Sequence, residues 1–196
     1  MSKRRSSCLI LFPLLVILTA AIAQAADTET SSIPARVQVL LFSKIWMFDR
    51  SVADNPEIVM AVLYQSRFRA SAEAKDQLIE AVRAEGLKVR CIPVPLDNVE
   101  HISSDLRDVK ADVFYVTEMR GINILEVVGI SRARRIKTIS VVPAYIEAGV
   151  AIGLRVRNDK PTIVVNLTAA KAEGSDLTAQ LLRVATIIGE KGSDTQ

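Results

Sequence analysis

The feature that most constrains the fold is an uninterrupted apolar run, Ile-Val-Met-Ala-Val-Leu, at residues 58–63. A strand without a polar side is typical of a sheet covered on both faces, as parallel sheets are. The following amphipathic pattern over residues 69–85 predicts a helix whose apolar face carries Leu78 and Val82. Gly86 then stands where a left-handed C-terminal cap is expected. The run therefore predicts the beginning of a strand–helix alternation.

The same alternation extends in both directions along the chain. Upstream, Pro34 opens an apolar helical segment that runs to Phe48. Downstream, strands are predicted at residues 87–94, 112–116 and 136–142. Helices are predicted between them, at residues 99–109 and 123–134. Alternating strand and helix patterns favour a mostly parallel central sheet with helices on both faces.

The last part of the pattern is different. Strands predicted at residues 149–156 and 162–167 are joined by Arg-Asn-Asp-Lys-Pro, a sequence typical of a hairpin turn. Ser175 can cap a final helix. Its predicted apolar face is formed by Leu177, Leu181, Val184 and Ile188. The expected fold is a single α/β domain with a mostly parallel sheet, helices on both faces and a C-terminal antiparallel hairpin.

The first 25 residues have the order of parts found in a secretory signal peptide. Lys3, Arg4 and Arg5 precede an apolar stretch, and Ala23-Gln24-Ala25 resembles a cleavage site. A retained membrane anchor is the alternative, but the apolar stretch is shorter than the about 20 residues that a spanning helix needs. We therefore expect cleavage after Ala25 and a mature protein in the periplasm.

The remaining chain is expected to comprise a flexible lead-in at residues 26–35, the α/β domain at residues 36–190 and a tail at residues 191–196. Three of the 25 Lys and Arg residues lie in the leader, which leaves 22 basic and 22 acidic side chains. A nucleic-acid-binding protein is expected to present a basic face with aromatic side chains. This balance argues against nucleic acid as a partner.

Few residues suggest chemistry. His101 is the single histidine and Cys91 the single cysteine after the leader, which excludes an intramolecular disulfide. Cys91 lies in an apolar predicted strand, where a free cysteine usually packs as a small hydrophobic residue. The sequence lacks a phosphate-binding loop, a dinucleotide fingerprint and a C-x-x-C pair. We expect no catalytic residue, no metal site and no cofactor, and therefore no enzymatic activity.

Two loops have a physical reason to bind something. In open α/β sheets, ligands lie beyond the carboxyl ends of strands, next to helix N-termini. Arg67 and Arg69 follow one predicted strand, and Thr117 and Arg120 follow another. If the strand order resembles 2-1-3-4, these side chains meet and can bind a carboxylate of a partner or an anion. The alternative is that the arginines are ordinary surface charges.

The order of several short motifs resembles the YfiR-like family of periplasmic regulators. These motifs are Lys44-Ile45-Trp46-Met47-Phe48-Asp49, Ala61-Val62-Leu63-Tyr64, Asp112-Val113-Phe114-Tyr115-Val116-Thr117, Ser131-Arg132 with Thr138, Gly149-Val150, Lys160-Pro161-Thr162-Ile163-Val164-Val165-Asn166-Leu167, and Ala169-Ala170 leading to Leu181-Leu182. Together they extend from about residue 36 to residue 190.

The resemblance implies a small periplasmic α/β protein that binds and represses the periplasmic part of a membrane diguanylate cyclase. An outer-membrane lipoprotein that relieves the repression is a further implied partner, and relatives are expected beside histidine kinases. The paired cysteines of the best-known members are absent, so disulfide-based control is not implied here. A homodimer stays open, and the competing interpretation is a single-lobe periplasmic protein that binds a small anion.

Export provides the first testable prediction. Mass spectrometry of the protein recovered from the periplasm is expected to find Ala26 at the N-terminus, because signal peptidase recognises the small residues at positions 23 and 25. A full-length product retained in the membrane would contradict the prediction.

Overall fold

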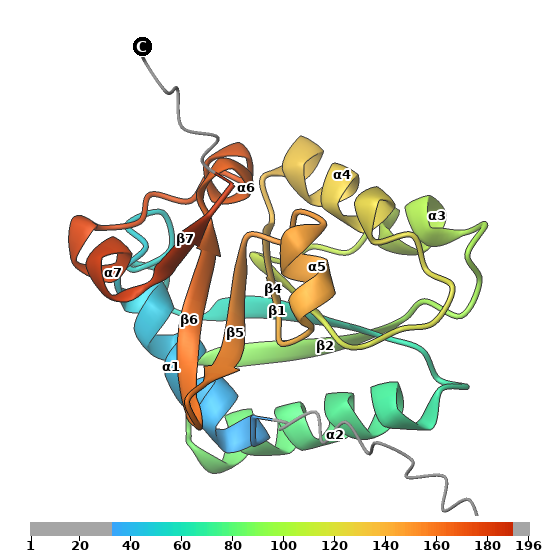
Figure 1. Ribbon diagram of the computed structural model, residues 1–196. Coiled ribbons are helices and arrows are strands. Elements are labelled where there is room, and N and C mark those ends of the chain that lie inside the picture. Colours follow the sequence, from blue (N-terminus) through green and yellow to red (C-terminus); the bar gives the residue numbers. More distant parts are fainter. Residues whose placement is uncertain (1–32, 190–196) are drawn as a thin grey trace, which may run out of the picture. The chain divides into compact units, whose positions relative to one another are not determined.

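The apolar run forms an interior strand of the sheet, next to the edge strand, in the computed structural model, which describes residues 33–189 (Figure 1). This strand, β1 (Ile58–Tyr64), pairs in parallel with β2 (Val89–Pro95) on one side and with β3 (Val113–Val116) on the other. Ala61, Val62 and Leu63 are all 0% exposed. The prediction of a strand buried on both faces is confirmed.

The sheet has seven strands in the order β2-β1-β3-β4-β5-β6-β7. Strands β4 (Lys137–Ser140) and β5 (Ile152–Arg157) continue the parallel part. Strand β6 (Lys160–Asn166) is antiparallel to β5, and β7 (Thr186–Ile188) lies parallel to β6. The β5–β6 turn places Asn158 and Asp159 at φ angles of 50° and 57°, as a tight hairpin turn requires. The predicted α/β fold with its antiparallel hairpin is confirmed.

Helices cover both faces of the sheet. On one face, α1 (Ala35–Met47) and α2 (Arg69–Ala84) pack against Val62 and Tyr115. On the other face, α3 (Ile102–Arg107) and α4 (Ile124–Arg134) pack against Leu63 and Val116. Neighbouring residues of one strand therefore serve opposite cores, because side chains alternate along a strand. None of the helices within residues 33–189 is long and apolar enough to cross a membrane.

Strand β2 is an edge strand with two prolines at suitable positions. Ile58 donates its N–H to Lys88 O, and Leu96 donates its N–H to Tyr64 O. In a parallel ladder this pattern directs the even-numbered amides of β2 towards β1. Pro93 and Pro95 occupy the positions whose amides would point away from the sheet, so the prolines cost no ladder hydrogen bond and hinder pairing with another strand.

The prediction of one long final helix is wrong. Helix α7 is limited to Ala179–Val184, and Thr186–Ile188 forms β7 beside β6. Thr178, rather than Ser175, is the N-cap residue, and it caps with no side-chain hydrogen bond. The β-branched residues Thr186, Ile187 and Ile188 suit a strand, and pairing with β6 outweighs their helical spacing. Two short helices, α5 (Pro143–Glu147) and α6 (Leu167–Ala172), were not predicted.

A test of this core uses Val62→Asp, with Val99→Asp as the control because Val99 is 48% exposed. Burying an unpaired carboxylate at Val62 is expected to cost several kcal/mol, a large share of the about 5–15 kcal/mol that stabilises a typical domain. Urea unfolding should show a much lower midpoint for Val62→Asp and little change for the control. Equal midpoints for the two variants would be inconsistent with this sheet.

Candidate functional site

The carboxyl ends of β1 and β3 form the point where the strand order reverses. The chain passes from β1 through α2 to β2 on one side, and β3 then lies on the other side of β1. The loop after β1 and the loop after β3 consequently leave the sheet side by side. In open α/β sheets this crevice is where ligands bind.

Gln65 ties these two loops together. Its side-chain Nε2 donates to Arg120 O at 2.9 Å, and Arg120 N donates to Gln65 Oε1 at 2.6 Å. The amide of one side chain thus satisfies both backbone groups of one residue in the opposite loop. These contacts bring the loop after β1 beside the loop that carries Arg120, whereas the predicted convergence of the arginine side chains stays a prediction.

The loop after β2 is held by Asp97. Its carboxylate accepts the Ser66 N–H at 2.7 Å and the Ser66 hydroxyl at 2.5 Å. The hydrogen bond from the Ser66 side chain is the main cause that lowers the pKa of Asp97, and the charge of Arg67 contributes in the same direction. The negative charge of Asp97 is therefore stabilised by Ser66 and Arg67, both in the loop after β1.

The loop after β3 is also tied to α5. The Tyr145 hydroxyl donates to Met119 O and accepts the Met119 N–H, both at 2.9 Å. Burial raises the pKa of Tyr145 further above neutral pH, where a tyrosine hydroxyl is already protonated and able to donate. We refer to the connected segments, residues 65–69, 96–101 and 117–123, as the carboxyl rim.

The four predicted site residues have different positions on this rim. Thr117 is 1% exposed. Its hydroxyl bonds to Leu63 O at 2.8 Å and to the Ser71 hydroxyl at 2.6 Å, so it fixes the loop from below. The side chains of Arg67, Arg69 and Arg120 are exposed. Arg69 is paired with Glu73 at 2.6 Å, one helical turn away.

Arg120 is the best-placed cation of the rim. Its guanidinium carbon lies 4.3 Å from the centre of the Phe68 ring. Such stacking orients the planar group while leaving its N–H donors available. The ion pairs formed among residues 33–189 include neither Arg67 nor Arg120. The rim can therefore offer oriented donors to a carboxylate of another molecule.

The described residues offer little for catalysis. Burial raises the pKa of the Cys91 thiol to about 11, so the reactive thiolate is scarce at neutral pH. His101 is exposed and contacts Asn98 at 3.2 Å. Within residues 33–189, no group of three or more His, Cys, Asp or Glu side chains is arranged to hold a metal ion.

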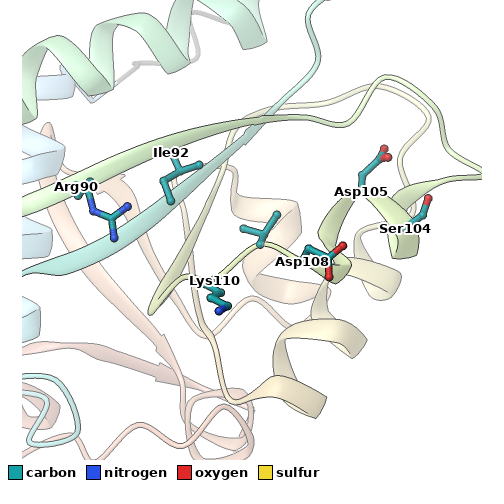
Figure 2. A pocket seen from close by; sticks show the side chains of 7 residues that line it. Arg90, Ile92, Ser104, Asp105, Asp108 and Lys110 are labelled. Atoms are coloured by element: carbon teal, nitrogen blue, oxygen red, sulfur yellow. The ribbon is translucent and has the colours of Figure 1, made fainter.

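A hollow of about 560 Å³ lies between β2 and α3, separate from the predicted residues (Figure 2). Its lining residues are Arg90, Ile92, Ser104, Asp105, Asp108, Val109 and Lys110. Arg90 enters from β2, whereas Asp105, Asp108 and Lys110 come from α3 and the segment directly after it. Arg90 is already paired with Glu57 at 3.0 Å.

Sequence reasoning missed a buried acid, Glu173, at the end of α6. It is 0% exposed. Its Oε1 accepts the hydroxyls of Thr138 at 2.7 Å and Ser131 at 3.1 Å, and its Oε2 accepts the Thr138 N–H at 2.7 Å. Glu85 also precedes a helix-ending glycine but is only half-buried and pairs with Arg36. The local sequence therefore carries no signal that distinguishes Glu173 from an ordinary surface glutamate.

The chain belongs to the YfiR/HmsC-like family, DUF4154, whose model matches residues 46–186. This range contains β1 to β6, the carboxyl rim and Glu173. The resemblance noted in the sequence motifs is thus confirmed. No curated protein sequence matches the chain.

Three solved structures share the fold. An ABC domain from Streptococcus pneumonia in complex with L-Trp is 16% identical with a TM-score of 0.60, covering 79% of this chain and 62% of that one. A conserved domain protein from Vibrio cholerae is 15% identical with a TM-score of 0.59, covering 79% and 60%. A substrate-binding protein with adhesive properties from Clostridium difficile, ligand-free and open, is 16% identical with a TM-score of 0.60, covering 80% and 60%. This chain spans about three fifths of each, and the likeness concerns the fold alone.

The role of Gln65 can be tested with Gln65→Ala, using Gln77→Ala on the exposed side of α2 as the control. Each lost hydrogen bond is worth about 0.5–1.5 kcal/mol. We therefore expect about 1–2 kcal/mol lower stability by urea unfolding and faster hydrogen exchange at the Arg120 amide. Unchanged exchange at Arg120 would show that Gln65 does not order the rim.

Proposed function

We propose that this protein is a periplasmic regulator that binds the periplasmic part of a membrane signalling protein and represses it. Membership of the YfiR/HmsC-like family is the observation that carries this proposal. The leader at residues 1–25 lies outside the described residues, and it supports the periplasmic location through its sequence alone. The partner proposed first is a diguanylate cyclase, so that the readout is cyclic-di-GMP. A histidine kinase is the second partner class.

The carboxyl rim is the proposed binding surface. Arg120, stacked on Phe68, and Arg67 are exposed and outside the ion pairs of the described residues. Both are proposed to contact acidic groups of the partner. Arg69 contributes at the border of the contact, since Glu73 already neutralises it. Thr117 enters the proposal as a positioning residue because it lies beneath the surface.

Repression needs a preference for one state of the partner. A regulator shifts an equilibrium only by its difference in affinity for the two states, and such couplings are typically about 1–3 kcal/mol. A rim already ordered by Gln65 and Asp97 loses little conformational freedom on binding. We propose no enzymatic step, and with Cys91 as the single cysteine of the mature chain no intramolecular disulfide takes part.

A single-lobe protein for a small anion is the second candidate. The likeness of this fold to a ligand-free substrate-binding protein favours it, together with the uncovered arginines of the rim. Calorimetric titration with small carboxylates at physiological salt separates the two candidates. Binding that is lost in Arg67→Glu/Arg120→Glu, without recovery of any membrane partner, would favour this second function.

The regulator proposal is tested by Arg67→Glu/Arg120→Glu. Exposed charges contribute about 0–1 kcal/mol to stability, so the fold should persist. Losing one member of a desolvated charge pair at an interface costs about 2–5 kcal/mol, so partner binding should fall at least tenfold. Recovery of the membrane partner from the periplasmic face should drop, and signalling in cells should be derepressed.

The matched control is Arg83→Glu/Arg107→Glu, which reverses two exposed arginines at the C-terminal ends of α2 and α3, the ends remote from the rim. It changes the net charge by the same amount. If both double variants recover the partner as well as the wild type, Arg67 and Arg120 are ordinary surface charges. If both lose the partner equally, the effect is one of net charge rather than of the rim.

A further inference from the structure

Glu173 joins four parts of the fold. Beyond its own hydrogen bonds to Ser131 on α4 and Thr138 on β4, the Thr138 hydroxyl accepts the Ala151 N–H at 2.8 Å, directly before β5. The Ser131 hydroxyl can instead donate to Val128 O, which lies at 2.8 Å. Glu173 accepts three hydrogen bonds in this arrangement, and these favour its charged form, whereas its complete burial without a salt bridge favours the neutral form. The network also accommodates a neutral carboxyl, because a protonated Glu173 can donate to the Ser131 oxygen once that hydroxyl turns to Val128.

The charged groups around Glu173 do not pair with it. Those on the elements packed against it are Glu126, Arg132 and Arg134 of α4, Arg135 directly after α4, Lys137 of β4 and Lys171 of α6, while Val150 and Ala151 before β5 are apolar. Glu126 accepts a hydrogen bond from Ser103, and Arg134 donates to Leu106 O and Val109 O. Arg132 donates to Gly149 O at 3.3 Å, and the side chain of Arg135 lies beside Gly174. None of the salt bridges among the described residues includes Glu173.

Glu173 is also the residue at which the C-terminal segment, residues 174–188, leaves α6. The Asp176 N–H donates to Asp49 Oδ1 at 2.9 Å, and the Thr178 N–H donates to Phe48 O at 2.9 Å. The segment ends in the edge strand β7, which has only three residues.

The contact of this segment with the end of α1 is imperfect. Trp46 Nε1, Ser175 Oγ and Thr178 Oγ1 are buried without a hydrogen-bond partner among the described residues. Unpaired buried polar groups lower stability, and regions with few satisfied contacts open first.

We propose that Glu173 is a pH-sensitive latch that keeps the C-terminal segment docked while its carboxyl is neutral and loosens the segment when it ionises. The proton leaves for solvent, and the charged carboxylate favours states in which it reaches water. This inference concerns the domain itself and does not depend on the partner proposed above.

The direction of the pH effect follows from the pKa. Burial raises the pKa of Glu173 from 4.5 to about 7, against opposing contributions from Thr138, Ser131 and Arg132. An acid whose pKa is higher in the folded than in the open state stabilises the folded state at low pH. That stabilisation is lost as the pH rises from 4.5 through about 7.

Hydrogen exchange at several pH values tests the latch on the full mature protein. Corrected for the intrinsic exchange rate, protection of residues 174–188 should fall about tenfold between pH 6 and pH 8. Residues 58–64 of β1 should keep their protection. In Glu173→Gln, which preserves the shape of the side chain, protection of the C-terminal segment should not change with pH. Glu80→Gln, at an exposed position of α2, should behave as the wild type.

Ser131→Ala provides a second variant with a directional effect. It removes a hydrogen bond that lowers the pKa of Glu173, so the loss of protection should move to higher pH. The latch is refuted if protection of residues 174–188 is independent of pH in the wild type, if Glu173→Gln retains the dependence, or if β1 loses protection in parallel.

Discussion

The burial of β1 on both faces is the constraint on which the rest of this structure depends. A strand with Ala61, Val62 and Leu63 fully buried needs a strand on each side and helices on each face. The chain meets this need by crossing from β1 through α2 on one face and from β2 through α3 on the other. Because the two crossovers diverge, a crevice forms at the carboxyl ends of β1 and β3. The position of the candidate site is thus a consequence of core packing.

The same crevice would bind poorly if its loops were mobile. Paired hydrogen bonds from Gln65, Asp97 and Tyr145 hold the loops after β1, β2 and β3. Each of these side chains bonds two groups of one residue in another loop, which restricts rotation as well as distance. An ordered surface retains more of its contact energy when it binds. Arg120 benefits most, since its backbone is fixed by Gln65 and its guanidinium rests on Phe68.

The two ends of the sheet have different characters. The β2 edge is protected by Pro93 and Pro95, whereas the other edge ends in the short strand β7. The segment that carries β7 is docked by backbone contacts to Phe48 and Asp49 and begins at the buried Glu173. We expect a charge on Glu173 to loosen this segment readily, because its contact with the end of α1 already contains unpaired buried polar groups. The rim and the latch are separate features, one for recognition and one for local stability.

The sequence by itself determined the α/β class, the doubly buried strand β1, the hairpin, and the loops that carry Arg67 and Arg120. These follow from local periodicity and from the rule that parallel strands end at a common edge. Tertiary structure alone decided that Thr117 is buried, that Gln65 bridges the rim, and that residues 186–188 are a strand rather than a helix. Tertiary structure also decided how deeply the glutamate is buried at each of two similar Glu-Gly helix ends. Glu85 is half-buried and pairs with Arg36, while Glu173 is fully enclosed by α4, β4 and α6, because burial depends on neighbours distant in the sequence.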